Sequence, residues 1–205
     1  MAVEVEIDGR RVRGAATRER LLAAARRLFG ERGYEATSIE SVLEASGVAR
    51  GALYHHFQSK AELFDAVLAD VLIEIAERTA AAAAAAGRKD TPEGLRAGSH
   101  AWLEMALDPA IQRIALLDPT TAVGWARWRA QDQAHSLGGL RATLLRLTGE
   151  GRVPAGQAEL LAHVLLAALN EAALFVAFAP DQRAAADTAR ATVDTLIDRL
   201  FTQPP

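Results

Sequence analysis

The sequence predicts an all-α protein, and three observations support that fold class. Apolar residues recur with the period of an amphipathic helix in nearly every segment. Glycine and proline fall mainly between these segments. No stretch shows the sustained two-residue alternation of a half-buried strand. We therefore expect packed helices throughout, arranged as an N-terminal three-helix domain followed by a larger helical domain.

Composition limits the class of protein. The chain has 205 residues, of which 50% are hydrophobic and 24% charged, a balance typical of a globular protein. It contains no cysteine, which excludes disulfides and cysteine-ligated zinc. No uncharged apolar run is long enough to cross a membrane, and the first residues lack the apolar segment of a signal peptide. These features predict a cytoplasmic protein without membrane contact.

Charge is unevenly distributed along the chain. The net charge is −3, yet residues 9–60 hold ten Lys or Arg against five Asp or Glu. A basic N-terminal segment on an acidic body favours contact of that end with a polyanion such as nucleic acid. An imbalance of this size also arises by ordinary variation, so charge alone leaves both interpretations open.

The first two predicted helices have clear signals. Thr17 can cap the first helix, whose apolar residues share one face: Leu21, Leu22, Ala25, Leu28 and Phe29. The residues "TSIE", 37–40, form a capping-box pattern in which Thr37 accepts a hydrogen bond from the amide of Glu40. The short helix that follows ends at Gly47.

The stretch "ARGALYHHF", residues 49–57, is predicted to be a third helix, exposed at its start. A further capping-box pattern, "SKAE" at residues 59–62, opens a long helix that ends at Gly87. Two short helices joined by a glycine-containing turn, after a longer helix, are typical of a helix-turn-helix. In that motif the second short helix lies in the major groove of DNA.

Residues in and near this helix are candidates for DNA contact. Gly51 and Ala52 are small, so the helix could approach the groove closely. Arg50 could donate two hydrogen bonds to a guanine edge or pair with a phosphate. The candidates for phosphate contact carry hydroxyl, imidazole or ammonium groups: Thr37, Ser38, Tyr54, His55 and Lys60. The alternative is an ordinary packed helix with an exposed tyrosine.

The segment "TSIESVLEASGVARGALYHHFQSKAELF", residues 37–64, closely resembles the DNA-binding signature of the tetracycline-repressor (TetR) family, as does the preceding "ATRERLLAAARRLFGERGYEAT". The resemblance implies an all-helical, homodimeric transcriptional regulator of a palindromic operator in double-stranded DNA. It also implies a repressor released by a small-molecule effector, which binds the variable C-terminal domain. Many family members have Ser or Thr where this chain has Ala49, and Thr where it has Ala52. The missing cap at Ala49 costs about 1 kcal/mol, and both departures leave the operator preference open.

These features predict three parts: a flexible arm over residues 1–14, a helix-turn-helix domain over 15–60, and a ligand-binding and dimerisation domain over 61–205. The arm carries three arginines that would reach a minor groove or phosphates, unless it is only a solubilising tail: Arg10, Arg11 and Arg13. In the third part, helices are predicted over residues 92–107, 110–117, 119–132, 136–149, 154–179 and 181–201.

Two features of the third part suggest a pocket for an apolar or flat ligand. Aromatic and thioether side chains recur at helical spacing, Trp102 with Met105 and Trp125 with Trp128. His163 and Asn170 share one face of a later apolar helix. An ordinary core with a structural hydrogen bond explains the same pattern.

The last two helices are predicted to form a four-helix dimer interface, because small residues alternate with large ones on one face of each. These faces hold Leu161, Leu165, Ala168, Ala172 and Phe175 in the first helix, and Ala189, Val193, Leu196, Ile197 and Leu200 in the second.

No nucleophile elbow, phosphate-binding glycine loop, dinucleotide fingerprint or zinc-binding histidine pair is present, so we expect no enzyme activity, cofactor or metal. One competing interpretation is an enzyme or carrier whose first helices only look like a helix-turn-helix. Binding of operator-length DNA would distinguish the two. Another is a DNA-binding activator, or a regulator without an effector. The effector and the regulated genes stay open.

Overall fold

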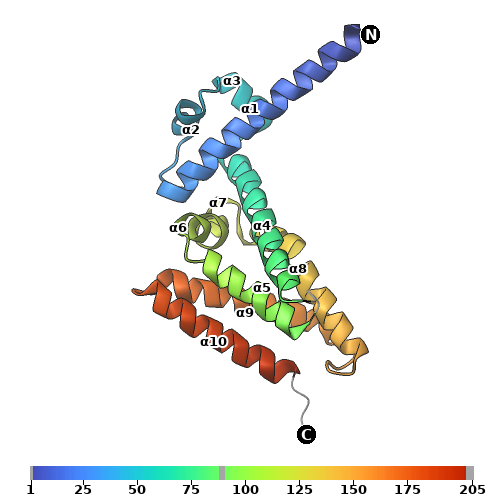
Figure 1. Ribbon diagram of the computed structural model, residues 1–205. Helices are drawn as coiled ribbons and strands as arrows, with labels where there is room; N and C mark the ends of the chain where they lie inside the picture. The colour runs from blue at the N-terminus through green and yellow to red at the C-terminus, as the bar shows by residue number, and fades with distance from the viewer. Residues whose placement is uncertain (1, 88–90, 202–205) are drawn as a thin grey trace.

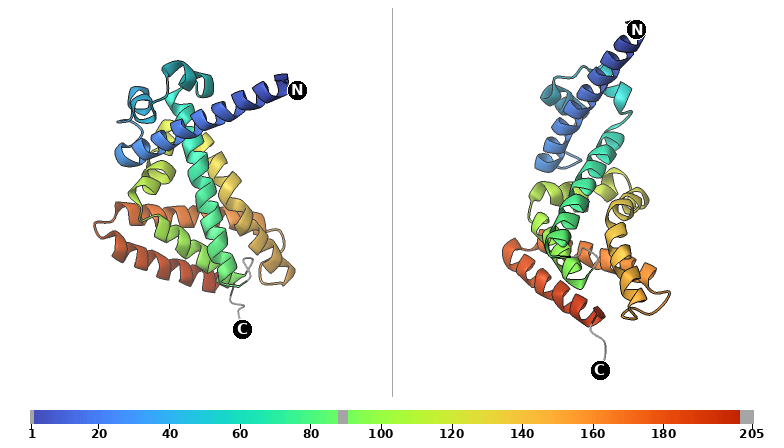
Figure 2. Two further views of the ribbon diagram at one scale, coloured as in Figure 1. Left: turned by 45° about the horizontal axis from the view of Figure 1, so that its top comes forward. Right: turned by 45° about the vertical axis from the view of Figure 1, so that its right-hand side comes forward.

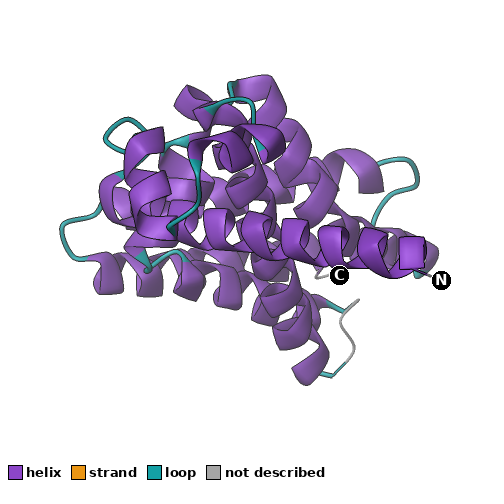
Figure 3. Ribbon diagram, turned by 90° about the horizontal axis from the view of Figure 1, so that it is seen from above, coloured by secondary structure: helices purple, strands orange, loops and turns teal. Residues whose placement is uncertain are grey.

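The computed structural model describes residues 2–87 and 91–201, and every regular element in these ranges is a helix (Figures 1 and 3). The predicted all-α class is confirmed. The elements in chain order are α1 (Ala2–Arg32), α2 (Ile39–Ser46), α3 (Arg50–His56), α4 (Lys60–Ala85), α5 (Pro92–Met105), α6 (Pro109–Ile111), the π-helix η1 (Gln112–Leu117), α7 (Pro119–Ala122), α8 (Trp125–Gly149), α9 (Ala158–Phe178) and α10 (Gln182–Phe201).

Helix α1 begins earlier than the sequence pattern indicated. It is continuous from Ala2, so Thr17 lies inside it and is not its N-cap. Gly14 does not interrupt it, since one glycine costs a helix only about 1 kcal/mol relative to alanine. The predicted arm, residues 1–14, therefore coincides with the start of α1, which projects beyond α3 in Figures 1 and 2. The side chains of its arginines, Arg10, Arg11 and Arg13, lie outside the described residues.

Helices α2 and α3 pack against α1 at one end of the molecule, which we call the tip (Figure 1). The predicted apolar face of α1 is buried as expected: Leu21, Leu22, Ala25, Leu28 and Phe29. Val42 from α2 and Leu53 from α3 are fully buried in the same core. Gly47, at φ 63°, closes α2 in the left-handed conformation that glycine adopts without strain.

The N-cap of α2 is Ser38, not Thr37 as predicted. Ser38 Oγ accepts from the amide of Ser41 at 3.1 Å, and Ser41 Oγ accepts from the amide of Ser38 at 3.2 Å. The capping box is thus one residue later than the "TSIE" pattern placed it. Glu40 is then at the second helical position, where its side chain cannot reach back to close the box.

Helix α4 connects the tip to the rest of the chain, which we call the body (Figures 1 and 2). Its predicted cap is present, because Ser59 Oγ accepts from the amide of Glu62 at 3.1 Å. The Glu62 carboxylate accepts from the amide of Gln58 at 2.7 Å, one residue before the cap. Side-chain hydrogen bonds therefore fix the N-terminus of α4 just after α3.

In the body, α5 packs against α4, α9 and α10, while α8 packs against α4 and α9. The two helices predicted over 119–132 and 136–149 are instead the short α7 and the continuous α8. The helical conformation is interrupted at Gly124, between α7 and α8. Its φ of 82° is rarely adopted by residues with a side chain. No residue between 132 and 136 interrupts the helical hydrogen bonding, so the predicted break there was wrong.

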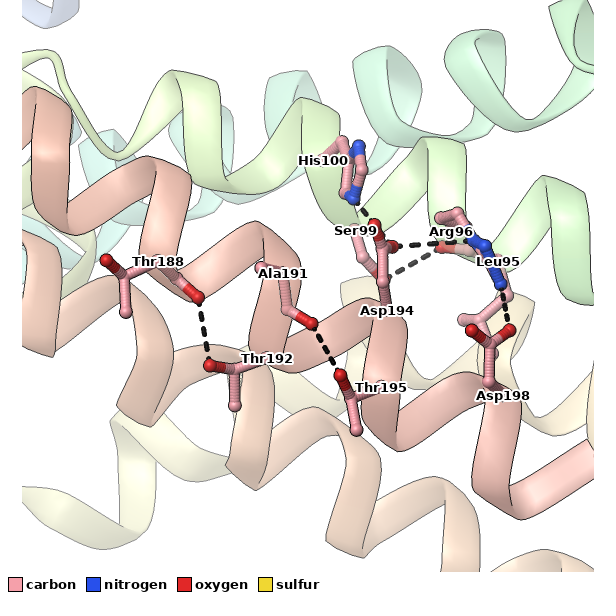
Figure 4. A network of polar contacts seen from close by, with 10 residues as sticks. All are labelled: Leu95, Arg96, Ser99, His100, Thr188, Ala191, Thr192, Asp194, Thr195 and Asp198. Atoms are coloured by element: carbon pink, nitrogen blue, oxygen red, sulfur yellow. Dashed lines mark hydrogen bonds and ion pairs between the residues drawn. The ribbon is translucent and has the colours of Figure 1, made fainter.

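Polar contacts hold α10 onto α5 (Figure 4). Arg96 Nη2 donates to Asp198 Oδ1 at 2.5 Å, and His100 Nε2 lies 2.8 Å from Asp194 Oδ1. Apolar residues of α10 are buried beneath these contacts, among them Val193 and Ile197. One face of α10 is thus already occupied within a single chain.

Candidate functional site

Helix α3 exposes its first turn at the tip. Leu53, at 0% exposure, and Phe57, at 2%, anchor it to the core. Tyr54 is 45% exposed, and a Cβ atom on Gly51 would meet no atom within 4 Å. The outer surface of α3 therefore has a bare backbone at Gly51, beside side chains that can donate hydrogen bonds.

Arg50, at the first position of α3, pairs with α2. Its Nη2 donates to Glu40 Oε1 at 2.7 Å, and both side chains are more than half exposed. The hydrogen bond from Arg50 lowers the pKa of the Glu40 carboxyl. Because a guanidinium has five N–H groups, Arg50 keeps donors for another partner while Glu40 orients it.

Two predicted contact residues have other partners in the structure. Thr37 is 1% exposed, and its Oγ1 donates to the carbonyls of Leu28 at 3.2 Å and Gly33 at 2.8 Å. Lys60 Nζ donates to the carbonyl of Tyr34 at 2.9 Å and lies 4.1 Å from the centre of its ring. Both side chains hold the turn between α1 and α2. The Thr37 hydroxyl is therefore too buried to reach a phosphate, whereas Lys60 is partly exposed and keeps two further N–H donors, so its phosphate contact stays a prediction.

The body contains a cavity of about 520 Å³ between α4, α5, α8, α9 and η1. This volume lies within the range of small-molecule sites, about 300–1,000 Å³. Its walls are mainly apolar, and seven of its lining residues carry buried or partly buried hydroxyl, carboxyl, imidazole or amide groups: Thr79, Ser99, Asp132, His135, Ser136, Thr143 and Asn170. A ligand could enter here.

Of the predicted ligand residues, Trp102 and Asn170 line this cavity. The indole of Trp102 donates to the carbonyl of Leu169 at 3.2 Å, which fixes its ring beside the cavity. Met105 is 3% exposed in the core and does not line it.

The other three predicted ligand residues also lie away from the cavity lining. Trp125 is 65% exposed, while the indole of Trp128 donates to the carbonyl of Ala115 at 3.1 Å. His163 Nε2 lies 3.4 Å from Glu159 Oε1, one turn earlier in α9. Trp125, Trp128 and His163 therefore do not line this cavity.

Asp132 was not among the residues predicted from the sequence. Its side chain is 3% exposed and accepts from Asn170 Nδ2 at 2.9 Å, while Arg129 Nη1 lies 3.5 Å from the same oxygen. Burial raises the pKa of the Asp132 carboxyl. One signal could have found it, because Asp132, His135, Ser136 and Gly139 follow the i, i+3, i+4, i+7 spacing of one helix face.

Two family models match the chain. Residues 21–67 match the model of bacterial regulatory proteins of the tetR family, and residues 92–200 match the tetracyclin repressor-like C-terminal domain. The second match alone covers more than half of the chain. The chain belongs to the TetR family. The resemblance noted from residues 16–64 is confirmed.

A curated repressor and two solved structures are similar to more than half of the chain. The HTH-type transcriptional repressor Rv1474c of Mycobacterium tuberculosis is 34% identical over 127 residues, which are 62% of this chain and 66% of that protein. The chain thus spans slightly less than two thirds of that repressor. A TetR-family transcriptional regulator from Pectobacterium atrosepticum is 34% identical, with a TM-score of 0.80 over 95% of this chain and 99% of that one. The structure of RolR in complex with resorcinol, at 18% identity and a TM-score of 0.66 over 94% and 96% of the two chains, shares the fold.

In this TetR-family chain, η1 lies between the cavity and the tip. Ala115 and Leu116 of η1 line the cavity. From the same segment, Arg113 Nη1 donates to the carbonyl of Gly30 at 3.2 Å, at the end of α1. Asp118 Oδ2 accepts from the amide of Tyr34 at 2.7 Å. One short π-helix and its cap therefore touch both the cavity and the tip.

Helices α9 and α10 leave an apolar surface uncovered, which we call the α9–α10 face. It is defined by large exposed side chains: Leu160, Val164, Phe175, Phe178 and Leu196. By length and composition alone, α9 also meets the criteria for a membrane-spanning helix, and 28% of its apolar window is buried. An exposed apolar stripe of this kind marks a surface that another element covers.

The predicted dimer residues divide between this face and the core of the chain itself. Leu165, Ala189, Val193 and Ile197 are buried within one chain, so they cannot meet a partner. Phe175 and Leu196 are exposed. The predicted interface is therefore wrong for these four buried residues, because α5 and neighbouring helices of the same chain already cover them.

Proposed function

We propose that the protein is a homodimeric, sequence-specific DNA-binding transcriptional regulator, most simply a repressor released by a small-molecule effector in the cytoplasm. The observation that carries the proposal is the exposed start of α3 at the tip, with an uncovered backbone at Gly51 beside Arg50 and Tyr54. We place the DNA-binding domain within residues 15–60 and the effector and dimerisation domain within 61–205. The similar curated proteins are transcriptional repressors, so we assign this chain no catalytic role.

In this proposal α3 enters the major groove of a palindromic operator. Arg50 and Ala52, near the start of the helix, read base edges, because the first residues of a recognition helix approach the bases. Tyr54, His55 and Ser38 donate to phosphates on either side of the groove. Glu40 is a positioning residue, since its carboxylate holds the guanidinium of Arg50 at 2.7 Å.

The test is selection of bound sequences from random and genomic DNA, followed by titration of the selected site. Arg50→Ala should weaken binding by about 1–3 kcal/mol and relax selectivity at one base pair, because a bidentate base contact is lost. Arg78→Ala, on the exposed side of α4 in the body, is the matched control and should change neither quantity. Failure of the unaltered chain to select any sequence would refute a sequence-specific regulator.

We assign the α9–α10 face to a second copy of the chain. Thr188, Thr192 and Thr195 are exposed on α10, yet each hydroxyl donates to the carbonyl four residues earlier, at 2.9 Å. Figure 4 shows the bonds of Thr192 and Thr195. With their hydroxyls occupied, these residues present methyl groups beside the exposed Leu196. A surface of small apolar groups on two neighbouring helices suits close packing into a four-helix interface.

We assign the cavity to the effector and η1 to its coupling with the tip. A ligand that shifts Ala115 or Leu116 also shifts Arg113 and Asp118, because all four belong to η1 and its cap. The contact at α1 is tight, since a Cβ on Gly30 would lie 2.6 Å from the Cβ of Ala110. Ala110 belongs to α6, which directly precedes η1, so a displacement of η1 that carries α6 with it would press on α1.

The contact between Asp118 and the tip gives a direct prediction. Asp118→Ala should lower the free energy of unfolding by about 1.5–3 kcal/mol, the usual range for a hydrogen bond to a charged group. It should also speed hydrogen exchange at the Tyr34 amide, whose acceptor is removed. Asp118→Asn keeps an acceptor oxygen and should largely restore both. Equal exchange at Tyr34 in all three proteins would show that this contact does not hold the tip.

A further inference from the structure

The charge of the cavity lining indicates which class of molecule the cavity accepts. Among the described residues that line it, the ionisable groups are Asp132, Glu77 and His135, with no lysine or arginine. A ligand with a carboxylate or phosphate would therefore meet two carboxyl groups and the imidazole of His135, but no ammonium or guanidinium group. Burial of an anion without a cationic partner costs several kcal/mol, as an order of magnitude.

Asp132 is the decisive group, because it is buried and only partly compensated. It lies in the body of α8, where its carboxylate accepts from Asn170 and is also near the hydroxyl of Ser136. The cation that faces it, Arg129 of the same helix, is 3.5 Å away, and its side chain lies outside the cavity lining. Despite these partners, burial still raises the pKa of Asp132, so its negative charge remains costly.

The rest of the cavity is apolar and suits a compact hydrophobic body. Trp102 lines it with its indole N–H already donated to Leu169, so its ring offers contact area rather than a free donor. Leu72, Ile75 and Leu166 are buried residues of the same wall. Glu77 is exposed and places a second carboxylate where the lining meets solvent.

We propose that the cavity takes a hydrophobic cation, a molecule with an apolar body and a protonated amine that pairs with Asp132. This inference rests on the proposed role of the cavity as the effector site. The ammonium offsets the buried carboxylate and donates to it, while the apolar body occupies the space beside Trp102. An aromatic ring also attracts a cation, which adds to the preference.

The test uses three probes with the same apolar body: 4-phenylbutylamine, 4-phenylbutan-1-ol and 4-phenylbutyrate. They are titrated calorimetrically into the full chain at pH 7, where the amine is charged and the carboxylate is ionised. The amine should bind at least about tenfold more tightly than the alcohol, a difference of about 1.4 kcal/mol. The carboxylate should bind most weakly.

Asp132→Asn keeps the shape of the side chain and removes its charge, so the preference for the amine over the alcohol should fall below about threefold. Asp70→Asn is the control, because Asp70 is an exposed carboxylate on α4 outside the lining, and it should keep the preference. The ranking of the three probes on the unaltered chain tests the proposal even where Asp132→Asn does not fold.

The outcomes separate this inference from the proposed function. Binding of the alcohol or the carboxylate as tight as that of the amine would refute the cationic class and leave the effector site standing. An unchanged preference in Asp132→Asn would refute the role of Asp132. No binding of any probe to folded protein would count against both the cationic class and the effector site.

Discussion

Replacing Gly51 by leucine should abolish operator binding and leave the fold intact. In the structure, a Cβ at position 51 meets no atom within 4 Å, so the larger side chain has room within the chain. Helix propensity even favours the change, by up to about 1 kcal/mol. In the proposed complex the same side chain points toward the groove and holds α3 away from the base edges. We expect affinity for the selected operator to fall at least about a hundredfold, or about 2.7 kcal/mol.

Two measurements separate the effects on folding and on binding. Chemical denaturation of Gly51→Leu should give a free energy of unfolding equal to or above that of the unaltered chain. Gly51→Ala adds a single methyl group and serves as the matched control, with binding close to normal. Normal operator affinity in Gly51→Leu would mean that α3 does not lie in the groove, and the proposed DNA-binding surface would have to be withdrawn.

The second large effect concerns the α9–α10 face. Phe175→Glu places a charge on a side chain that is 55% exposed in the single chain, so the fold should persist while association is lost. A monomer engages only one half-site. Since linked binding exceeds single-site affinity by a factor of about 10²–10⁴, operator affinity should fall by more than about a hundredfold.

Leu145→Glu is the control, because Leu145 is 56% exposed on α8, away from this face. Sedimentation should show a monomer for Phe175→Glu and a dimer for both the unaltered chain and the control. Leu165→Arg would not serve, because Leu165 is 3% exposed and its replacement would disrupt the core of the chain itself. A monomer for the unaltered chain at micromolar concentration would contradict the assignment of the α9–α10 face.

Local signals predicted the tip well. The buried face of α1, the left-handed Gly47 and the anchor Leu53 all follow from patterns within a few residues of each other. The errors there were also local, because two adjacent hydroxyl residues, Thr37 and Ser38, competed for the same cap. In the structure Ser38 is the N-cap of α2, while Thr37 is buried and its hydroxyl donates to the carbonyl of Gly33.

By itself, the sequence determined the all-α class, the helix-turn-helix and the family. The reason is that helical periodicity and capping depend on residues that are close together in the sequence. Only the tertiary structure decided that Asp132 meets Asn170, 38 residues away, and that Trp125 is exposed while Trp102 lines a cavity. It also decided which face of α9 remains uncovered. The physical reason is that helical spacing shows which side chains share a face, whereas burial depends on which distant helix packs against that face.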